Sequence, residues 1–314
     1  MKILFTGGSS FTGYWFIKKL AQAGHNVHAT FTSKDISTYT GIRKERIIQL
    51  MPICEPVFEC RFGSQIFMEL LNDNWDILCH HAADVSDYKS QNFNVINALT
   101  DNTNQIKLVV EKLASNGCKS VLLTSSIFQQ NEGIGSFPLR AFSPYGLSKG
   151  LTSDIFEFYC QINEIKLGKF VIPNPFGPFE EPRFTTFLAQ SWVNGEIPKV
   201  NTPLYIRDNI HITPLAEAYL LFAVELFKEN ILLAKLNPSC YIEDQGSFTS
   251  RFSDEMVQRL NVPCEYELKN QTEFDEPLIR VNSLPISSYV GNWDEKICWD
   301  ELAEYYLSNL GGSK

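Results

Sequence analysis

The sequence predicts an α/β fold in which a doubly wound parallel sheet is accompanied by a smaller mixed α/β domain. Strand-like and helix-like segments alternate over the first 172 residues, which is typical of a parallel sheet covered by helices. Beyond residue 172 proline becomes frequent and the alternation is lost. We therefore place the sheet domain at residues 1–173 with 208–235, and the smaller domain at residues 174–207 with 236–314.

A glycine-rich turn joins the first predicted strand, residues 2–6, to the first predicted helix, residues 14–23. The turn contains Gly7, Ser10, Phe11 and Gly13. Strand, glycine turn and helix form the geometry that lays a dinucleotide pyrophosphate against a helix N-terminus, where free amides stabilise the phosphates. Ser10 departs from this pattern, because it adds a side chain where a third glycine is expected. The alternative is that these glycines are ordinary turn residues.

The rest of the first domain continues the alternation. Further strands are predicted at residues 26–31, 76–81, 120–124 and 169–172, and further helices at residues 65–71, 90–113 and 145–162. The two long helices carry apolar residues at helical spacing. An apolar helix at residues 214–227 is predicted to return to the sheet.

Composition and charge narrow the class of protein. Of the 314 residues, 44% are hydrophobic and 20% charged, which is ordinary for a soluble globular protein. A net charge of −9 argues against nucleic-acid binding, and the densest basic segment, residues 43–46, is short enough to be a solvated face. The longest apolar stretch, residues 218–224, is too short to span a bilayer.

The eight cysteines are scattered, without a C-x-x-C pair or a cluster with histidine. This pattern favours reduced thiols and indicates neither a disulfide framework nor a metal site. The first strand begins almost at Met1, which leaves no room for a signal peptide. We therefore expect a cytoplasmic protein.

A second group of residues has the pattern of acid–base chemistry. Tyr145 and Lys149 are four residues apart on a predicted helix and therefore share a face. A neighbouring ammonium lowers the pKa of a phenol and makes it a usable acid or base. The preceding strand ends in Thr124, Ser125 and Ser126, whose hydroxyls suit the orientation of a carbonyl oxygen. The alternative for the Tyr–Lys pair is an ordinary surface contact.

Taken together, these motifs resemble the extended short-chain dehydrogenase/reductase family over nearly the whole chain. The resemblance is carried by the glycine turn, His81-Ala82-Ala83, Ser126, the run Pro144-Tyr145-Gly146-Leu147-Ser148-Lys149, Asn174-Pro175-Phe176-Gly177-Pro178 and Arg207-Asp208-Asn209-Ile210-His211. It implies a Rossmann sheet with bound NAD or NADP. It also implies action on a nucleotide-activated sugar as an epimerase, dehydratase, decarboxylase or ketoreductase.

The resemblance also implies roles for individual residues. Tyr145 would donate or accept the proton, Lys149 would bind the nicotinamide ribose and lower the phenol pKa, and Ser126 would hydrogen-bond the reacting oxygen. The cofactor would be lined by Gly7, Ser10, Phe11, Gly13, His81, Ala82 and Ala83. Asn174 and Arg207 would contact the nucleotide and diphosphate of the substrate; for Arg207 the alternative is a structural ion pair with Asp208. We expect His80, His81 and His211 to stabilise structure rather than to catalyse.

The choice of cofactor depends on the end of the second strand. NAD enzymes place an acid there to bind the ribose 2′-hydroxyl. Here Thr32, Ser33 and Lys34 follow the strand, and the first acid is Asp35. This run suits a 2′-phosphate and predicts NADP, with NAD as the alternative. Lys34 as a solvated loop lysine is the competing interpretation.

The reaction class follows from the residues after Ser126. A 4,6-dehydratase needs an acid pair there, whereas this chain has Ile127-Phe128; Gln129-Gln130 replace the usual Val-Tyr. An exchangeable NADP favours a reductase over an epimerase, which keeps NAD bound through both half-reactions. We therefore expect NADPH-dependent reduction of a keto group on a nucleotide-activated deoxysugar. The alternatives are a nucleotide-sugar 4-epimerase and a non-catalytic dinucleotide sensor, which usually loses the tyrosine or lysine.

The two long predicted helices also indicate how two copies of the chain could associate. Each has apolar residues beyond one stripe, such as Val95 and Phe156. The family resemblance suggests that they pair across a two-fold axis into the four-helix contact of a homodimer. The alternative is that these residues simply pack on the sheet.

Overall fold

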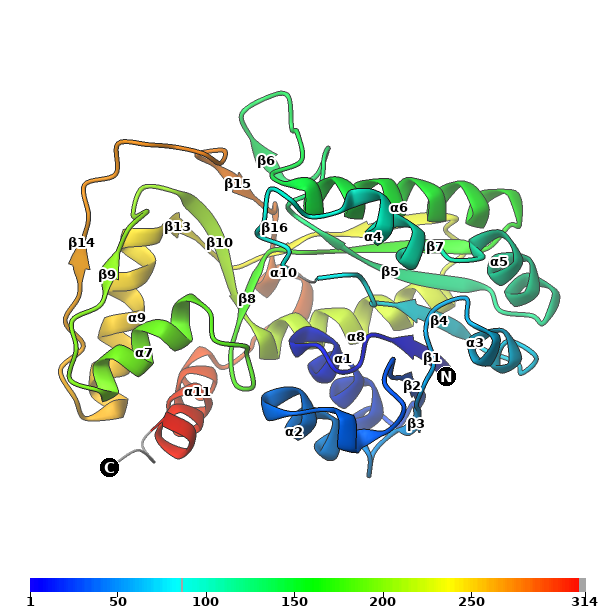
Figure 1. Ribbon diagram of the computed structural model, residues 1–314, viewed down its shortest axis with the longest axis horizontal. Coiled ribbons are helices and arrows are strands. Elements are labelled where there is room, and N and C mark those ends of the chain that lie inside the picture. Colours follow the sequence, from blue (N-terminus) through cyan, green and yellow to red (C-terminus); the bar gives the residue numbers. More distant parts are fainter. Residues whose placement is uncertain (86, 311–314) are drawn as a thin grey trace. The chain divides into compact units, whose positions relative to one another are not determined.

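The computed structural model describes residues 1–85 and 87–310 of the chain (Figure 1). The chain forms two compact units. The first contains Met1–Glu132, Pro138–Ile172 and Ala216–Asn237, and the second contains Gly133–Phe137, Pro173–Leu215 and Pro238–Lys314, the last four of these lying outside the described residues. These limits differ from the boundaries placed on the sequence mainly at residues 133–137 and 208–215, which fall in the second unit. Residues 134–135 and 206–209 pair with strands of that unit.

The first unit is built on a seven-stranded sheet with the order β11-β7-β5-β4-β1-β2-β3, in which every neighbouring pair is parallel. The strands are β1 (Lys2–Thr6), β2 (Asn26–Thr30), β3 (Glu55–Val57), β4 (Ile77–His80), β5 (Ser120–Ser126), β7 (Lys166–Ile172) and β11 (Leu233–Leu236). The order reverses between β1 and β4. Ligands of such sheets bind where this reversal opens a crevice at the carboxyl ends of the strands.

Helices cover both faces of this sheet (Figure 1). They are α1 (Phe11–Gln22), α2 (Gly41–Leu50), α3 (Gln65–Leu70), α4 (Val95–Asn102), α5 (Ile106–Ser115), α6 (Pro144–Ile162) and α8 (Ile212–Lys228), with a short 3₁₀ turn η1 (Ile36–Thr38) after β2. Because helices cover both faces, the central strands β1, β4 and β5 are buried along nearly their whole length. The predicted doubly wound parallel sheet is confirmed.

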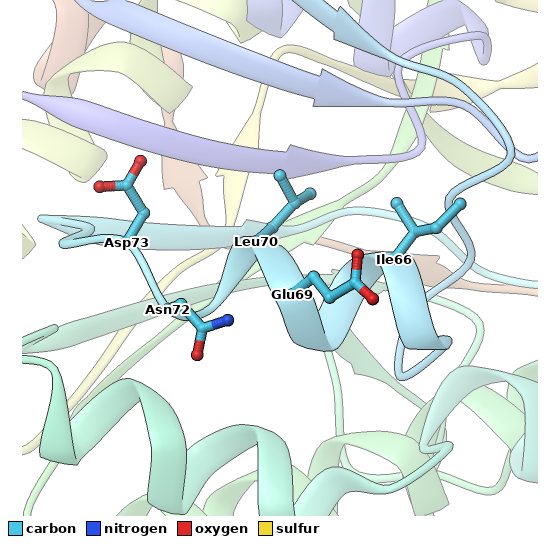
Figure 2. Close-up of a pocket in the computed structure, with 5 residues that line it drawn as sticks. All are labelled: Ile66, Glu69, Leu70, Asn72 and Asp73. Atoms are coloured by element: carbon cyan, nitrogen blue, oxygen red, sulfur yellow. The ribbon is translucent and has the colours of Figure 1, made fainter.

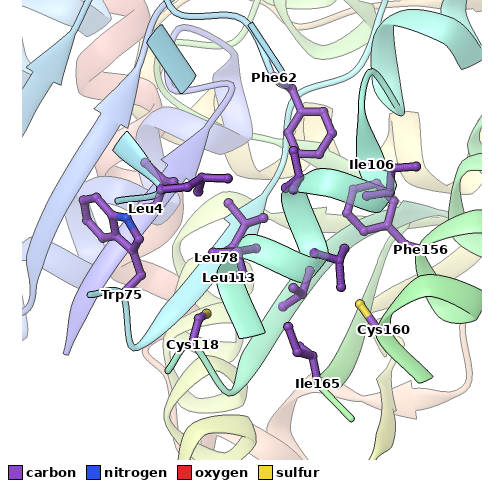
Figure 3. Packing of buried hydrophobic residues seen from close by; sticks show 14 of the residues in the cluster. Leu4, Phe62, Trp75, Leu78, Ile106, Leu113, Cys118, Phe156, Cys160 and Ile165 are labelled. Atoms are coloured by element: carbon purple, nitrogen blue, oxygen red, sulfur yellow. The ribbon is translucent and has the colours of Figure 1, made fainter. Parts of the chain in front are cut away.

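Each face has its own core. On one face, Leu78 and Val121 of the strands pack with Phe67, Val109 and Phe156 of α3, α5 and α6 (Figure 3). Phe156 is fully buried there, so this residue belongs to the core rather than to a dimer contact. The opposite face is aromatic and holds α1 and α8 against the sheet. Its rings are Phe5 of β1, Phe16 of α1, Phe170 of β7 and Tyr219 of α8, with Phe16 and Tyr219 stacked at 4.0 Å.

One predicted helix is wrong in extent. Instead of a single helix over residues 90–113, the structure has α4 and α5, separated by residues 103–105. The break follows a polar run in which Asn and Asp favour turns over helix interiors. Gln105 adopts a positive φ of 54° and donates through its side chain to the Gly63 carbonyl (2.9 Å). The helix begins at Val95 because Asn94 caps it by accepting from the Asn97 amide.

The second unit contains a three-stranded sheet with the order β13-β10-β8. Its elements are β6 (Ile134–Gly135), β8 (Asn174–Phe176), α7 (Phe184–Val193), β9 (Lys199–Val200), β10 (Ile206–His211), β12 (Pro238–Ser239), β13 (Tyr241–Asp244), α9 (Gln245–Leu260), β14 (Glu267–Leu268), β15 (Arg280–Val281), β16 (Leu284–Pro285), α10 (Ile286–Val290) and α11 (Glu295–Leu310). Trp192, Phe252 and Trp299 form the centre of its core. Among the residues that the structure describes, no helix combines the length and apolar character needed to cross a membrane.

Candidate active site

The turn between β1 and α1 is packed too tightly for side chains at its glycines. Gly7 has a φ of +84°, and a Cβ on it would lie 2.8 Å from the Ala82 amide nitrogen. A Cβ on Gly13 would collide with the Gly7 carbonyl oxygen. Ser10 caps α1: its hydroxyl accepts from the Gly13 amide (3.1 Å) and donates to the Gly7 carbonyl (2.9 Å). The Ser10 side chain therefore forms hydrogen bonds within the turn.

This turn fits a dinucleotide phosphate. A helix leaves its first four amides without intrahelical acceptors. In α1 the Ser10 hydroxyl accepts from the Gly13 amide, and the Ser10 carbonyl accepts from the Tyr14 amide. Among the described contacts, this leaves the amides of Phe11 and Thr12 for an anion, and the first turn of α1 contains no acidic residue to repel it.

A buried arginine supports the same turn. Arg46 of α2 is fully buried, donates to the Ser9 carbonyl (3.1 Å) and lies over the Phe11 ring at 5.9 Å. The interpretation of residues 43–46 as a solvated face is therefore wrong for Arg46. Its guanidinium adds positive charge beside the residues predicted to hold the pyrophosphate.

The end of β4 forms the neighbouring wall. The Thr6 hydroxyl accepts from the amides of His81 (3.1 Å) and Ala82 (3.0 Å), and lies 3.0 Å from Nδ1 of His80. Burial, and secondarily the charge of Lys149, lowers the pKa of both His80 and His81 to about 3, so both imidazoles are neutral near pH 7. The first strand thus holds residues 80–82 directly beside Gly7.

The predicted acid–base pair lies at the start of α6. Ser143 caps this helix by accepting from the Gly146 amide (3.2 Å). Lys149 is 5% exposed, and its Nζ donates to the Thr124 carbonyl of β5 at 2.7 Å. Burial lowers the pKa of Lys149 from its ordinary value of 10.5 to about 8. The Tyr145 ring meets the rings of Tyr88 and Phe93 edge-on, at 5.6 and 5.9 Å.

Close packing holds this part of α6 against the end of β5. A Cβ on Gly146 would collide with the Phe128 carbonyl oxygen, so only glycine lets the helix approach the strand this closely. Ser126 is the last residue of β5, and its hydroxyl accepts from the Phe128 amide (3.2 Å). Tyr145, Lys149 and Ser126 therefore come from two elements that are tied together at one end of the sheet.

Gln129 and Gln130, which depart from the family pattern, both support this region. Gln129 is buried, and its Oε1 accepts from the Ser126 amide at 3.4 Å. The Gln130 amide occupies the space that a Cβ on Gly150 would need. Ile127 is buried, so an apolar side chain fills one of the two positions where a dehydratase would carry its acids.

The second unit contains the predicted substrate residues Asn174, at the start of β8, and Arg207, in β10. The ion pair of Arg207 is with Glu276 (2.8 Å). Asp208 instead accepts from the amides of Cys240 and Asn282, and burial raises its pKa to about 7. The alternative of an Arg207–Asp208 pair is therefore wrong.

Sequence reasoning missed a second buried arginine in this unit, Arg280 of β15. Its pKa is lowered by burial and then by the charge of Arg207, so the two guanidinium groups are close enough to repel each other. Such a pair is suited to a bridging anion. The only sequence signal was an arginine inside the apolar run Leu278-Ile279-Arg280-Val281.

A cavity of about 310 Å³ in the second unit is lined by Phe184, Phe187, Lys199, Val200, Asn201, Thr202 and Gln245. A cavity of about 440 Å³ in the first unit lies beside α3 and is lined by Ile66, Glu69, Leu70, Asn72 and Asp73 (Figure 2). The cavity beside α3 precedes β4 at the amino edge of the sheet and carries two carboxylates, which would repel an anionic cofactor. Among the described residues, no group of His, Cys, Asp and Glu is placed to hold a metal ion.

The buried ammonium of Lys149 predicts a pH dependence of stability. Because its pKa is about 8 when folded and 10.5 when exposed, the unfolded chain binds more protons between these values. The unfolding free energy of the wild type, relative to Lys149→Met, should be constant below about pH 8 and rise by on the order of 3 kcal/mol toward pH 10.5. Urea unfolding of both proteins across this range measures the difference. If the unfolding free energies of the two proteins change with pH in the same way, the lowered pKa of Lys149 is wrong.

Comparisons with known proteins agree with this geometry. The sequence profile of the NAD dependent epimerase/dehydratase family matches residues 3–231. No functionally curated protein matches the chain. A solved UDP-glucose 4-epimerase from Thermotoga maritima, with UDP-glucose, is 19% identical at a TM-score of 0.75, covering 99% of this chain and 100% of that one.

Two further solved structures are similar over nearly their whole length. A UDP-glucuronic acid 4-epimerase from Bacillus cereus, in complex with UDP-glucuronic acid and NAD, is 16% identical at a TM-score of 0.75, covering 98% of this chain and 99% of that one. A dTDP-glucose 4,6-dehydratase from Streptomyces venezuelae with NAD bound is 15% identical at a TM-score of 0.74, covering 99% and 98%.

The family match spans most of the chain, including the glycine turn and the Tyr145–Lys149 pair. The resemblance to extended short-chain dehydrogenases/reductases is therefore confirmed. The chain belongs to the NAD dependent epimerase/dehydratase family of NAD(P)-dependent enzymes.

Proposed function

We propose that the protein reduces a keto group on a nucleotide-activated deoxysugar, with NADPH as the reductant and Tyr145 as the proton donor. The observation that carries this proposal is the buried ammonium of Lys149. Its Nζ donates to the Thr124 carbonyl. Lys149 lies one helical turn after Tyr145 in α6, and Thr124 lies two residues before Ser126 in β5. A buried cation beside a phenol favours the phenolate that remains after proton transfer.

The chain's residues divide the chemistry among them. The nicotinamide, when bound, supplies a hydride to the carbonyl carbon. The Ser126 hydroxyl would donate a hydrogen bond to the substrate carbonyl oxygen and stabilise the negative charge that develops on it. Tyr145 gives that oxygen its phenolic proton, which completes the alcohol. Lys149, with a pKa of about 8, is mostly charged at neutral pH and stabilises the resulting phenolate.

The second unit suits the nucleotide part of the substrate. Arg207 and Arg280 place two buried positive charges close together, which would attract a diphosphate. The Arg207 guanidinium is already held in place, because Nη1 donates to backbone carbonyls and Nη2 to Glu276. Phe184, Phe187 and Asn201 line a cavity of about 310 Å³ in which a base has aromatic surface and an amide partner. Two of the similar solved proteins hold UDP-glucose or UDP-glucuronic acid. These observations support a nucleotide-sugar substrate, and Asn174 as a further contact.

The loop after β2 supports NADP. Asp35, its first acid, is already used: it caps η1 by accepting from the Ser37 amide (2.7 Å). Thr32 and Lys34 are exposed on the same loop. The Asp35 carboxylate is therefore already hydrogen-bonded within the loop, while the Lys34 ammonium is accessible to a 2′-phosphate.

A second candidate function is 4-epimerisation with bound NAD. It is favoured by the comparisons, because two of the similar solved proteins are 4-epimerases and two hold NAD. Tyr145, its phenolate stabilised by Lys149, would then take a proton from one substrate hydroxyl and return it to the product. The two functions differ in whether added NADPH is consumed.

We also propose a homodimer formed through α4 and α6. Ile96, Leu147 and Phe158 on these helices are 67%, 40% and 57% exposed, so both helices present apolar surface that a second copy of the chain would cover. The helices contact each other and share one face of the sheet.

All eight cysteines are free thiols, which fits the predicted cytoplasmic location.

The reaction is tested by following NADPH oxidation with UDP- and dTDP-linked 4-keto-6-deoxysugars. The wild type should oxidise NADPH, and Tyr145→Phe should lower kcat by about 10²–10⁴ because the proton donor is lost. Tyr159→Phe, on the same helix, is the control and should retain activity. Interconversion of hydroxyl epimers without added NADPH would establish the epimerase instead. A Tyr145→Phe protein with undiminished function would favour the sensor.

The cofactor preference is tested by titrating NADP and NAD into the protein. Lys34→Ala should raise the Kd for NADP about tenfold, because one charge-assisted contact is lost, and leave the Kd for NAD unchanged. Lys107→Ala, an exposed lysine of α5, is the matched control. Equal weakening of both dinucleotides by Lys34→Ala would rule out a 2′-phosphate contact.

The dimer is tested by sedimentation of Ile96→Asp and Phe158→Asp variants. Both should shift a dimeric wild type to monomers, since a carboxylate cannot be buried unpaired at an apolar contact. Ile48→Asp, at an isoleucine of α2 that is 52% exposed, should remain dimeric. A wild-type protein that sediments as a monomer would contradict the proposed dimer.

A further inference from the structure

His81 connects the phosphate-binding turn to the strand that holds Lys149. Its ring is flanked by Phe5 and Phe16, at centroid distances of 5.7 and 5.5 Å. Nδ1 lies 2.9 Å from the Thr124 hydroxyl. Nε2 lies 3.0 and 3.1 Å from the hydroxyls of Ser10 and Thr12. Apolar rings thus fix the imidazole, while both of its nitrogens have polar partners.

The surrounding hydrogen bonds assign the tautomer. The Ser10 hydroxyl donates to the Gly7 carbonyl and accepts from the Gly13 amide, so one lone pair remains. That lone pair accepts from Nε2–H of His81, and Nδ1 then accepts from the Thr124 hydroxyl. Burial lowers the pKa of His81 to about 3, so this neutral form persists over the usual range of pH.

The chain of contacts continues to the acid–base pair. The carbonyl of Thr124, the residue whose hydroxyl bonds His81, accepts from Nζ of Lys149 at 2.7 Å. At the other end, a Cβ on Gly13 would lie 3.1 Å from Cδ2 of His81, so the ring also packs directly against the turn. One imidazole therefore lies between the residues proposed to bind phosphate and the residue proposed to stabilise the phenolate.

We infer that His81 is a positioning residue whose two nitrogens have separate tasks. Nε2 fixes the phosphate-binding turn through Ser10 and Thr12, and Nδ1 fixes the Thr124 peptide that holds Lys149. This inference rests on the proposed function in that the turn is taken to bind a dinucleotide. It adds a role for the His81 ring that requires no contact of the ring with cofactor or substrate: the ring sets dinucleotide affinity on one side and the proton affinity of Lys149 on the other.

Two amide substitutions separate these tasks. In His81→Asn the amide reaches only the position of Nδ1, so the contact with Thr124 is kept and the turn is released. The Kd for NADP or NAD should rise about tenfold, as for one lost hydrogen bond, with the Lys149 titration unchanged. In His81→Gln the amide reaches the position of Nε2. The Kd should stay near the wild-type value, while the pKa of Lys149, followed by ¹³C NMR without ligand, should fall.

Controls keep the test independent of folding and of the proposed reaction. Thr12→Val removes a turn hydroxyl with little change in shape and should weaken binding as His81→Asn does. His28→Gln, at a partly buried histidine of β2 packed on Trp75, should change neither quantity. In the ligand-free wild type, ¹⁵N NMR should show His81 protonated at Nε2 and not titrating between about pH 5 and 9.

The outcomes distinguish the inference from the proposed function. If His81→Asn and His81→Gln change both quantities equally, or neither, or if His81 titrates near its ordinary pKa, the two-task role is wrong. If the wild type binds neither NADP nor NAD, the proposed function fails. The ¹⁵N tautomer and the Lys149 titration would then still decide whether His81 holds Thr124.

Discussion

The hydrogen bond from the Lys149 ammonium to the Thr124 carbonyl is the contact on which the rest of the site depends. A buried charge is unfavourable unless it is well paired, and burial lowers the pKa of this lysine to about 8. The protein nevertheless keeps Lys149 only 5% exposed, at a point where α6 meets the end of β5. Because the helix is fixed there, Tyr145, one turn earlier, is held near the carboxyl ends of the strands.

The sheet explains why this point coincides with the phosphate-binding turn. β1 and β4 are neighbours at the reversal of strand order, and β5 lies next to β4. The turn after β1, the residues after β4 and the end of β5 therefore meet at one edge. Three hydroxyls, those of Ser10, Thr12 and Thr124, converge on His81 at this edge. The serine that departs from the glycine pattern thus contacts His81, the residue after β4, and Thr124 of β5 contacts the other nitrogen of the same ring.

The parts of the fold that local pattern specifies were predictable from the sequence. The strands and helices around the glycine turn follow from short-range apolar periodicity, and so does the placement of Tyr145 and Lys149 on one helix. The break between α4 and α5 was missed because apolar residues recur at helical spacing on both sides of it. Only the polar run before Gln105, and its contact with Gly63, marks the interruption.

The contacts that depend on distant segments were not predictable in this way. Arg46 read as solvated because its partner, the Ser9 carbonyl, lies on another element. Arg280 was missed because a bridge between two distant segments, at Ile206 and Ile279, brings it near Arg207. Phe156 looked like surplus apolar surface, yet it fills the core beside His80 and Phe62. In each case the sequence showed the residue type, and tertiary packing decided its surroundings.

A crystal structure of the protein grown with NADP⁺ tests the central claim most directly. We expect the pyrophosphate on the amides of Phe11 and Thr12, and the nicotinamide ring facing Tyr145 and Lys149. Density for the ring elsewhere, or these two side chains directed away from it, would contradict the account.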